Sequence, residues 1–220
     1  MASGGSSNDE QNTTDEQITE AIMMRVLRDE LRQAELPAGV AMPPLPETKP
    51  LPDKDDILTT QLAQTIKIIG DDLVKHKPLN DTIDGLARTI MANPQSFSQN
   101  IFQVAQQVFA DGINWGRIVV LIYTVAKLIV KMVLARLPEQ VTAILSWTLD
   151  YFKTNLLQWV IKMGGWFCSI APITCFRIES VPGLIPTEPP SGQAIGLACF
   201  LGGIVLGSCL VLVLKGKTQH

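Results

Sequence analysis

The side chains most able to act as nucleophiles or metal ligands are four cysteines and two histidines, at positions 168, 175, 199, 209, 76 and 220. The cysteines show neither the close pairing of a metal site nor the spacing of a redox motif. No histidine lies near Cys168 or Cys175, and no glycine-rich loop follows a strand pattern. The sequence therefore predicts no enzyme, no cofactor and no metal site, and the cysteines are interpreted as reduced packing residues.

Residues 62–73 combine an apolar side of a helix with an adjacent carboxylate, and such a helix can be recognised by a groove in another protein. Four apolar side chains, spaced four, three and four residues apart, form what we call the ridge: Leu62, Ile66, Ile69 and Leu73. This spacing places them on one side of a helix. Gly70 lets another backbone approach, and Asp71 stands beside the ridge, as in a helix that binds in a groove. Periodicity alone favours the other interpretation, that the ridge packs into the core of its own chain.

A second group, Asn114, Trp115, Gly116 and Arg117, precedes a nearly uncharged stretch. Asn114 can cap a helix. The guanidinium of Arg117 suits a carboxylate, which it can hold with two parallel hydrogen bonds. The plainer interpretation of Arg117 is an ordinary surface ion pair, worth about 0–1 kcal/mol. Trp115 and Gly116 are interpreted as structural, since the indole fills space between helices and the glycine allows close approach.

A third group lies further along the chain and contains three tryptophans and two glycines: Trp147, Trp159, Gly164, Gly165 and Trp166. Aromatic residues at these spacings usually belong to the core. In this order the three groups resemble the death-motif ridge and the first and second homology motifs of the Bcl-2 family of apoptosis regulators. The resemblance covers roughly residues 15–166 plus a hydrophobic tail, and the Bax-type pro-apoptotic branch is the most similar.

The resemblance implies an all-α fold, a Bcl-2-like helical bundle around a hydrophobic central hairpin, with a C-terminal transmembrane tail helix. It also implies that Arg117 faces the rim of a groove. There it would pair with the aspartate of an incoming ridge, a role that Asp71 of another copy would play.

Helix signals divide the chain into a disordered N-terminus over residues 1–13, a bundle over 14–176, a linker over 177–193 and a tail over 194–214. Within the bundle, six prolines make residues 37–54 a mobile loop. Helices are expected at about 14–36, 55–76, 81–91, 96–111, 118–134, from 138 onward, and 166–175.

Particular residues set these expected boundaries. Capping boxes at Thr14 with Gln17 and Ser96 with Gln99 begin two helices, and Pro78 ends one. Pro138 suits a first turn. Residues 118–134 are apolar on most sides, with a polar seam of Arg117, Thr124, Lys127 and Lys131. Such a helix is expected in the middle of the bundle.

Composition narrows the class of protein. At 220 residues, 46% hydrophobic and with a mean hydropathy of +0.21, the chain is too apolar for a purely soluble domain. The formal net charge of −3, without a basic cluster, argues against nucleic acid as a partner.

The expected tail, residues 194–214, carries no charge. At about 1.5 Å per residue it reaches roughly the 30 Å of a bilayer's hydrocarbon layer, so it is interpreted as a tail anchor inserted after translation. The alternative is a buried core helix. Gly203 and Gly207 form a GxxxG pair, which is weak evidence for packing between tails.

Three hypotheses of function follow. The favoured one is a pro-apoptotic Bax-like effector, cytoplasmic at rest, which on activation inserts into and oligomerises in the mitochondrial outer membrane and permeabilises it to release apoptogenic factors. Its partners would be activator death-motif helices, other Bcl-2 family proteins, copies of itself and membrane lipid. Constitutive anchoring and an endoplasmic reticulum location stay open. The alternatives are an anti-apoptotic member that sequesters death-motif helices in its groove, and a tail-anchored adaptor.

Overall fold

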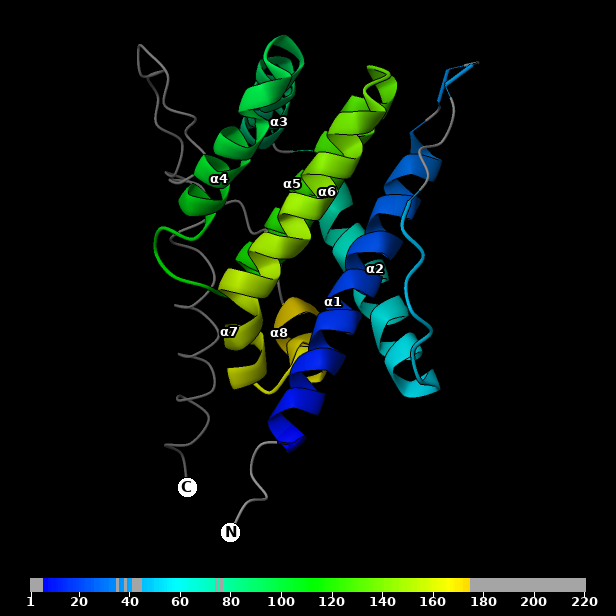
Figure 1. Ribbon diagram of the computed structural model, residues 1–220, viewed down its shortest axis with the longest axis vertical. Coiled ribbons are helices and arrows are strands. Elements are labelled where there is room, and N and C mark those ends of the chain that lie inside the picture. The colour runs from blue at the N-terminus through cyan, green and yellow to red at the C-terminus, as the bar shows by residue number, and fades with distance from the viewer. Residues whose placement is uncertain are drawn as a thin grey trace, which may run out of the picture.

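The computed structural model of the chain describes residues 6–34, 36–37, 39–40, 45–73, 75 and 77–174. In this part of the chain the regular structure is helical throughout, which confirms the all-α prediction (Figure 1). The α-helices are α1 (Ser6–Gln33), α2 (Asp53–Leu73), α3 (Lys77–Ala92), α4 (Phe97–Val108), α5 (Trp115–Leu134), α6 (Pro138–Tyr151), α7 (Leu157–Lys162) and α8 (Ile170–Thr174).

Helix α5 forms the centre of the bundle. It contacts α1, α2, α3, α4, α6 and α8, and Figure 1 shows it behind α6, with α1 and α2 on one side and α3 and α4 on the other. Only Lys127, Lys131 and Leu134 along α5 escape full burial. A helix that is apolar on nearly every side is stable only when other helices surround it. The predicted central position is therefore confirmed.

Helix α1 begins earlier than the sequence indicated. It starts at Ser6, so Thr14 and Gln17 lie inside the helix and do not form the expected capping box. Nor does the second expected box form. The Ser96 hydroxyl donates to the carbonyl of Asn93 (2.9 Å) and accepts from Asn100 Nδ2 (2.9 Å), and it makes no cap to α4. Local side-chain bonds of this kind compete with caps. The predicted start of α4 is nevertheless correct, because Ser96 is the residue directly before Phe97, and only the side-chain cap is missing.

Prolines begin two of the helices. Pro138 lies in the first turn of α6, as expected. Pro78, expected to end a helix, lies instead in the first turn of α3, where its missing N–H would have had no partner anyway. The loop over 37–54 likewise ends earlier than expected, because α2 begins at Asp53, directly after Pro52.

A π-helical turn, Phe152–Leu156, joins α6 to α7. The wider turn shifts which side chains face inward, so that both Leu156 and its neighbour Leu157 are buried. Nothing in the apolar spacing indicated this turn.

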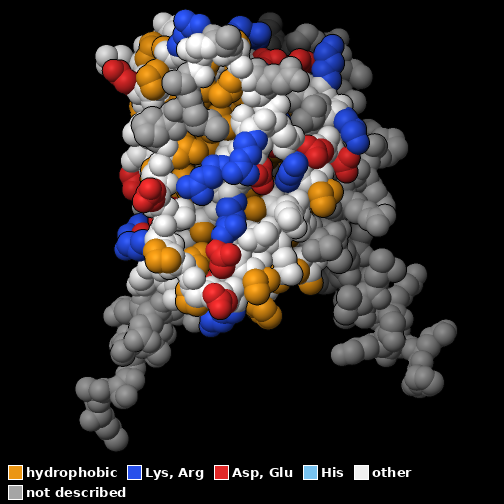
Figure 2. Space-filling model, turned by 90° about the vertical axis from the view of Figure 1, so that its right-hand side faces the viewer, with side chains coloured by type: hydrophobic (Ala, Val, Ile, Leu, Met, Phe, Trp, Pro, Cys, Tyr) orange, Lys and Arg blue, Asp and Glu red, His pale blue; other side chains and the backbone are white. Residues whose placement is uncertain are grey.

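The side of the bundle formed by α1 and α2 is held by polar contacts. Arg25 of α1 pairs with Asp56 and donates a hydrogen bond to the hydroxyl of Thr60 (2.9 Å), both on α2. Figure 2 shows Lys and Arg side chains gathered in the middle of this face, with acidic side chains beside them and hydrophobic ones scattered between.

Within the described residues, none of the helices taken singly combines the length and the hydropathy needed to cross a bilayer. Pro138–Lys162 and Trp166–Ile173, which meet at 77°, satisfy both criteria only when taken together. The expected linker at 177–193, the tail at 194–214 and the Gly203–Gly207 pair lie outside the described residues.

Candidate functional site

The ridge of α2 is buried in the bundle. Its four side chains are each at most 6% exposed: Leu62, Ile66, Ile69 and Leu73. Asp71 and Asp72, which follow Gly70, are exposed, and Asp72 forms an ion pair with Lys75 (2.7 Å). The helix thus turns its apolar side to α1 and α5 and leaves the Asp71 carboxylate in water. This is the packed arrangement expected for a closed chain.

At Gly70, the backbone of α2 lies against the Tyr123 ring of α5. A Cβ atom placed on Gly70 would lie 2.6 Å from Cδ2 and Cε2 of Tyr123. Any side chain at this position would push α2 away from α5. In the closed chain, the space left free by Gly70 is therefore filled by the ring of Tyr123, a contact that no sequence pattern indicated.

Tyr123 is fully buried, and its hydroxyl has no hydrogen-bond partner among the described residues. Burial raises the pKa of Tyr123 above its ordinary value, and the nearby carboxylates of Glu30 and Asp71 raise it further. The hydroxyl is thus neutral, and unpaired in the described part of the chain.

We expect Tyr123→Phe to raise the free energy of unfolding by about 1 kcal/mol, because it removes an unpaired buried hydroxyl and keeps the ring against Gly70. Urea denaturation at neutral pH measures this change. Tyr151→Phe is the control, since Tyr151 is only partly buried and should change stability little. A loss of stability in Tyr123→Phe would show that the hydroxyl has a partner.

Arg117 is buried, with 3% of its side chain exposed, and its guanidinium contacts the loop that precedes α5. Nη2 lies 2.9 Å from Asp111 Oδ2, and Nη1 donates to the carbonyl of Gly112 (2.6 Å). Asp111, predicted from the sequence only as part of a helix end, is thus the carboxylate that Arg117 holds in the closed chain. The structure does not bring Asp71 to Arg117, and their pairing between two copies stays a prediction.

Asn114 is the N-cap of α5. Its Oδ1 accepts a hydrogen bond from the backbone N–H of Arg117 (2.8 Å), which confirms the predicted cap. The cap holds the first turn of α5 in place, and with it the backbone position of Arg117.

We expect Asn114→Ala to lower the free energy of unfolding by about 1 kcal/mol, since the backbone N–H of Arg117 loses its hydrogen-bond acceptor. Asn114→Asp should keep most of that stability, because aspartate caps helices as well as asparagine does. The two midpoints in urea decide this. Equal losses of stability in both variants would mean that the loss does not come from the side-chain cap.

Trp115 and Trp166 belong to one aromatic cluster that joins α5, the π-helical turn and α7. The Trp115 ring centroid lies 5.0 Å from that of Trp159 and 5.5 Å from that of Trp166. The Phe152 ring stacks on Trp166 at 5.8 Å. Gly116 is buried beside Trp115. The space-filling role predicted for these residues is confirmed for Trp115 and Trp166, whereas Trp159 is only partly buried.

Gly164 and Gly165 turn the chain so that Trp166 docks on α1. Both have positive φ angles, 94° and 73°. The Trp166 backbone N–H donates to Asp15 Oδ1 (3.2 Å), and its indole Nε1–H donates to Thr19 Oγ1 (2.8 Å). Asp15, 2% exposed, is a partner that no sequence signal revealed, since it lies among other polar residues near the start of the chain.

Trp147 lies apart from this cluster. Its ring stacks on Tyr151 at 5.1 Å, and Tyr151 also meets Phe102 and Phe109 of the α4 region. The five residues predicted as the second motif therefore serve two different contacts.

The two lysines of the polar seam of α5 pair with acidic residues on neighbouring helices. Lys127 Nζ lies 2.5 Å from Oε2 of the buried Glu30 on α1, and it stands over the Tyr123 ring at 5.3 Å from the centroid. Lys131 Nζ lies 2.5 Å from Oδ1 of the half-exposed Asp84 on α3. A continuous series of contacts thus runs from α2 through α5 to α1, formed by Gly70, Tyr123, Lys127 and Glu30.

Comparison with known proteins gives relatives of one kind. Residues 66–166 match the family described as "Apoptosis regulator proteins, Bcl-2 family". "Apoptosis regulator BAX" of Homo sapiens is 35% identical over 122 residues, which is 55% of this chain and 60% of that protein. "Bcl-2 homologous antagonist/killer" of Homo sapiens is 27% identical over 162 residues, 70% and 72% of the two chains. The match thus spans somewhat more than half the length of the BAX relative.

Solved structures share the fold. The chicken BOK crystal structure superposes with a TM-score of 0.54 at 23% identity, over 73% of this chain and 96% of that one. Trichoplax adhaerens trBcl-2L2 bound to trBak BH3 gives a TM-score of 0.52 at 20% identity, over 73% and 97%.

Proposed function

We propose that this chain, whose residues 66–166 match the Bcl-2 family, is a pro-apoptotic effector of the Bax type. In this proposal the closed bundle is the resting form. Activation frees the ridge of α2, which then binds the groove of a second copy beside Arg117, and the assembled copies permeabilise the mitochondrial outer membrane.

The ridge itself carries the proposal, because it combines complete burial with an exposed carboxylate at its edge. Withdrawing its four aliphatic side chains from the core costs about 1.5–3 kcal/mol each. Helix α2 therefore leaves the bundle only when an equivalent apolar surface receives it. A second copy supplies such a surface together with Arg117, which on activation exchanges its closed-chain partner Asp111 for the incoming Asp71. Exchange between identical chains gives a symmetric dimer.

Two further observations support an effector over other family members. The BAX relatives of human, cattle, mouse and rat are 35–36% identical to this chain. Lys127 and Lys131 are the partly exposed cations on the otherwise apolar helix α5 of the α5–α6 hairpin. An amphipathic side of this kind suits a partly wetted position in a damaged bilayer. A solved relative of the fold is bound to a BH3 segment of Bak, which supports a death-motif helix as the activating partner here.

Dye release from liposomes of mitochondrial lipid composition tests the proposal, with the full chain and an activator helix peptide. We expect release by the parent chain and by Asp72→Asn, and little release by Asp71→Asn. The two exposed aspartates are neighbours, so the pair of variants holds charge and fold constant while changing only the carboxylate beside the ridge. Equal release by both variants would contradict the pairing of Asp71 with Arg117.

The same assay decides the alternative role as a survival factor. A survival factor would bind the peptide, release no dye, and protect the liposomes from a second effector. Absence of both binding and release would leave the adaptor hypothesis.

For the location, we propose a cytoplasmic resting form that moves to the mitochondrial outer membrane. Fractionation of cells before and after a death stimulus checks this, and a chain found on membranes at both times would contradict it.

A further inference from the structure

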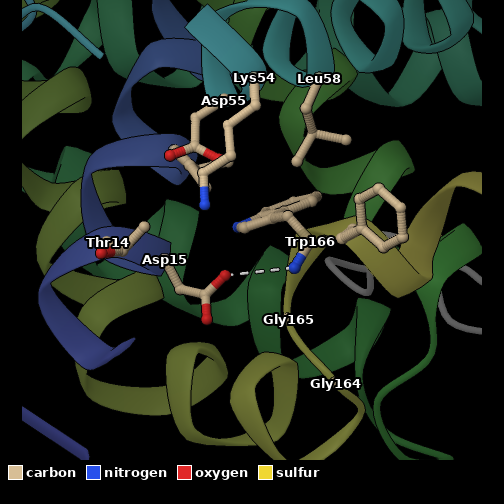
Figure 3. A pocket seen from close by; sticks show the side chains of 10 residues that line it. Thr14, Asp15, Lys54, Asp55, Leu58, Gly164, Gly165 and Trp166 are labelled. Carbon is tan, nitrogen blue, oxygen red and sulfur yellow. Dashed lines mark hydrogen bonds between the residues drawn. The ribbon is translucent and has the colours of Figure 1, made fainter. Parts of the chain in front are cut away.

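A cavity of about 650 Å³ opens between the start of α2, the nearby part of α1 and the Gly164–Phe167 segment (Figure 3). None of the four ridge side chains lines it. The cavity therefore belongs to the opposite end of α2 from Asp71, and its occupation is independent of the proposed effector function.

Two buried carboxylates face this cavity. Asp15 of α1 is 2% exposed and Asp55 of α2 is 8% exposed, and both line the space. Asp15 already accepts the N–H of Trp166. The carboxylate of Asp55 points from α2 into the cavity in Figure 3, and it forms no hydrogen bond or ion pair within the described part of the chain. A buried carboxylate without a partner is unfavourable unless a cation joins it.

Lys54 offers only part of that charge. Its side chain extends into the same space in Figure 3, between Asp55 and Asp15. Among the described residues it lies within 4.0 Å of no carboxylate, and the side chain is exposed. The cavity is thus lined by the exposed ammonium of Lys54 and the two buried carboxylates, which together give it a net negative charge.

Apolar side chains supply the rest of the wall. Ile18 and Leu58 are buried where they line the cavity, and the Phe167 ring, 74% exposed, lines it as well. An exposed ring face attracts organic cations as well as alkyl chains. The volume falls within the roughly 300–1,000 Å³ typical of small-molecule sites.

We propose that this cavity binds an organic cation, an ammonium or guanidinium group on an apolar stem. The cationic head group is held by Asp55, with Asp15 behind it, and the stem lies along Leu58 and Phe167. An anion is excluded by the two carboxylates. A metal ion is disfavoured, because the described residues contain no group of three or more histidine, cysteine or acidic side chains that could hold one.

Two probes separate the sources of such a cation. 4-Phenylbutylammonium represents a free amine, and acetyl-arginine amide represents the side chain of a peptide. Each is titrated into the full chain, with the Trp166 indole N–H followed by NMR, and 4-phenylbutanol serves as the neutral counterpart. We expect at least one cation to shift this signal and the alcohol to bind about tenfold more weakly or not at all. The cation with the lower Kd identifies the source.

Variants test the assigned residues. Asp55→Asn should weaken binding about tenfold, whereas the matched control Asp53→Asn, exposed in the same first turn, should change it less than about twofold. Lys54→Met should strengthen binding, because it removes the internal competitor. The proposal is overturned if the alcohol binds as well as both cations, if Asp53→Asn weakens binding as much as Asp55→Asn, or if no probe shifts the Trp166 signal.

Discussion

Lys127→Met is expected to lower the free energy of unfolding by about 3–5 kcal/mol, the range found when one partner of a buried ion pair is removed. Glu30 is 2% exposed, and Lys127 Nζ is the cation beside it at 2.5 Å. Methionine fills the space of the lysine stem but leaves the carboxylate of Glu30 buried without a counter-charge. The contact with the Tyr123 ring is lost as well. Urea denaturation followed by circular dichroism gives the difference.

Lys131→Met is the matched control on the same helix. Its partner Asp84 is 44% exposed, so water replaces the lost ion pair, and the change should stay within about 0–1 kcal/mol. The double variant Glu30→Gln with Lys127→Met should recover most of the loss, because it leaves no charge buried. Similar losses in Lys127→Met and Lys131→Met would show that burial of Glu30 does not decide the effect.

Gly70→Ala is expected to destabilise the closed chain by about 1–3 kcal/mol, the usual cost of forcing extra volume into a packed core. The new methyl group would lie 2.6 Å from two ring carbons of Tyr123, so α2 must move away from α5. Since the ridge lies on the same helix, the variant should also release liposome dye at a lower concentration of activator peptide, as the proposed function requires.

Gly85→Ala is the control for helix propensity. Gly85 lies within α3, and a Cβ there would meet only Arg88 Nη2, at 4.0 Å. Alanine should therefore stabilise that helix by roughly 1 kcal/mol. The two glycine variants are expected to shift the urea midpoint in opposite directions. A stabilising Gly70→Ala would mean that Tyr123 does not lie against α2.

The parts of the fold that the sequence predicted are those with long, uniform patterns. Helix α5 is apolar on nearly every side, and its central position follows from that alone. The ridge of α2 was readable because four residues repeat at helical spacing. The start of α1 was less predictable, since Thr14 suits both a cap and a helix interior. The π-helical turn has no periodic signal, because it changes the period itself.

Partners that no helical spacing or capping pattern fixes were not predictable in the candidate site. Arg117 was identified, but its carboxylate partner Asp111 was not, because aspartate before glycine also ends helices. Glu30 and Asp15 look like surface residues in the sequence, and only the packing of α1 on the bundle buries them. Side chains whose role depends on a partner far along the chain carry no local signal, whereas the cap at Asn114 was predictable because its partner lies three residues away.

The docking of Trp166 on α1 has a consequence for synthesis. Its bonds to Asp15 and Thr19 join positions 151 and 147 residues apart, so they cannot form until Trp166 has left the ribosome. Contacts of such long range also form late in refolding, because a large loop must close first. The start of α1 therefore stays without this anchor while α2 and α5, which cover its apolar side, have already been synthesised.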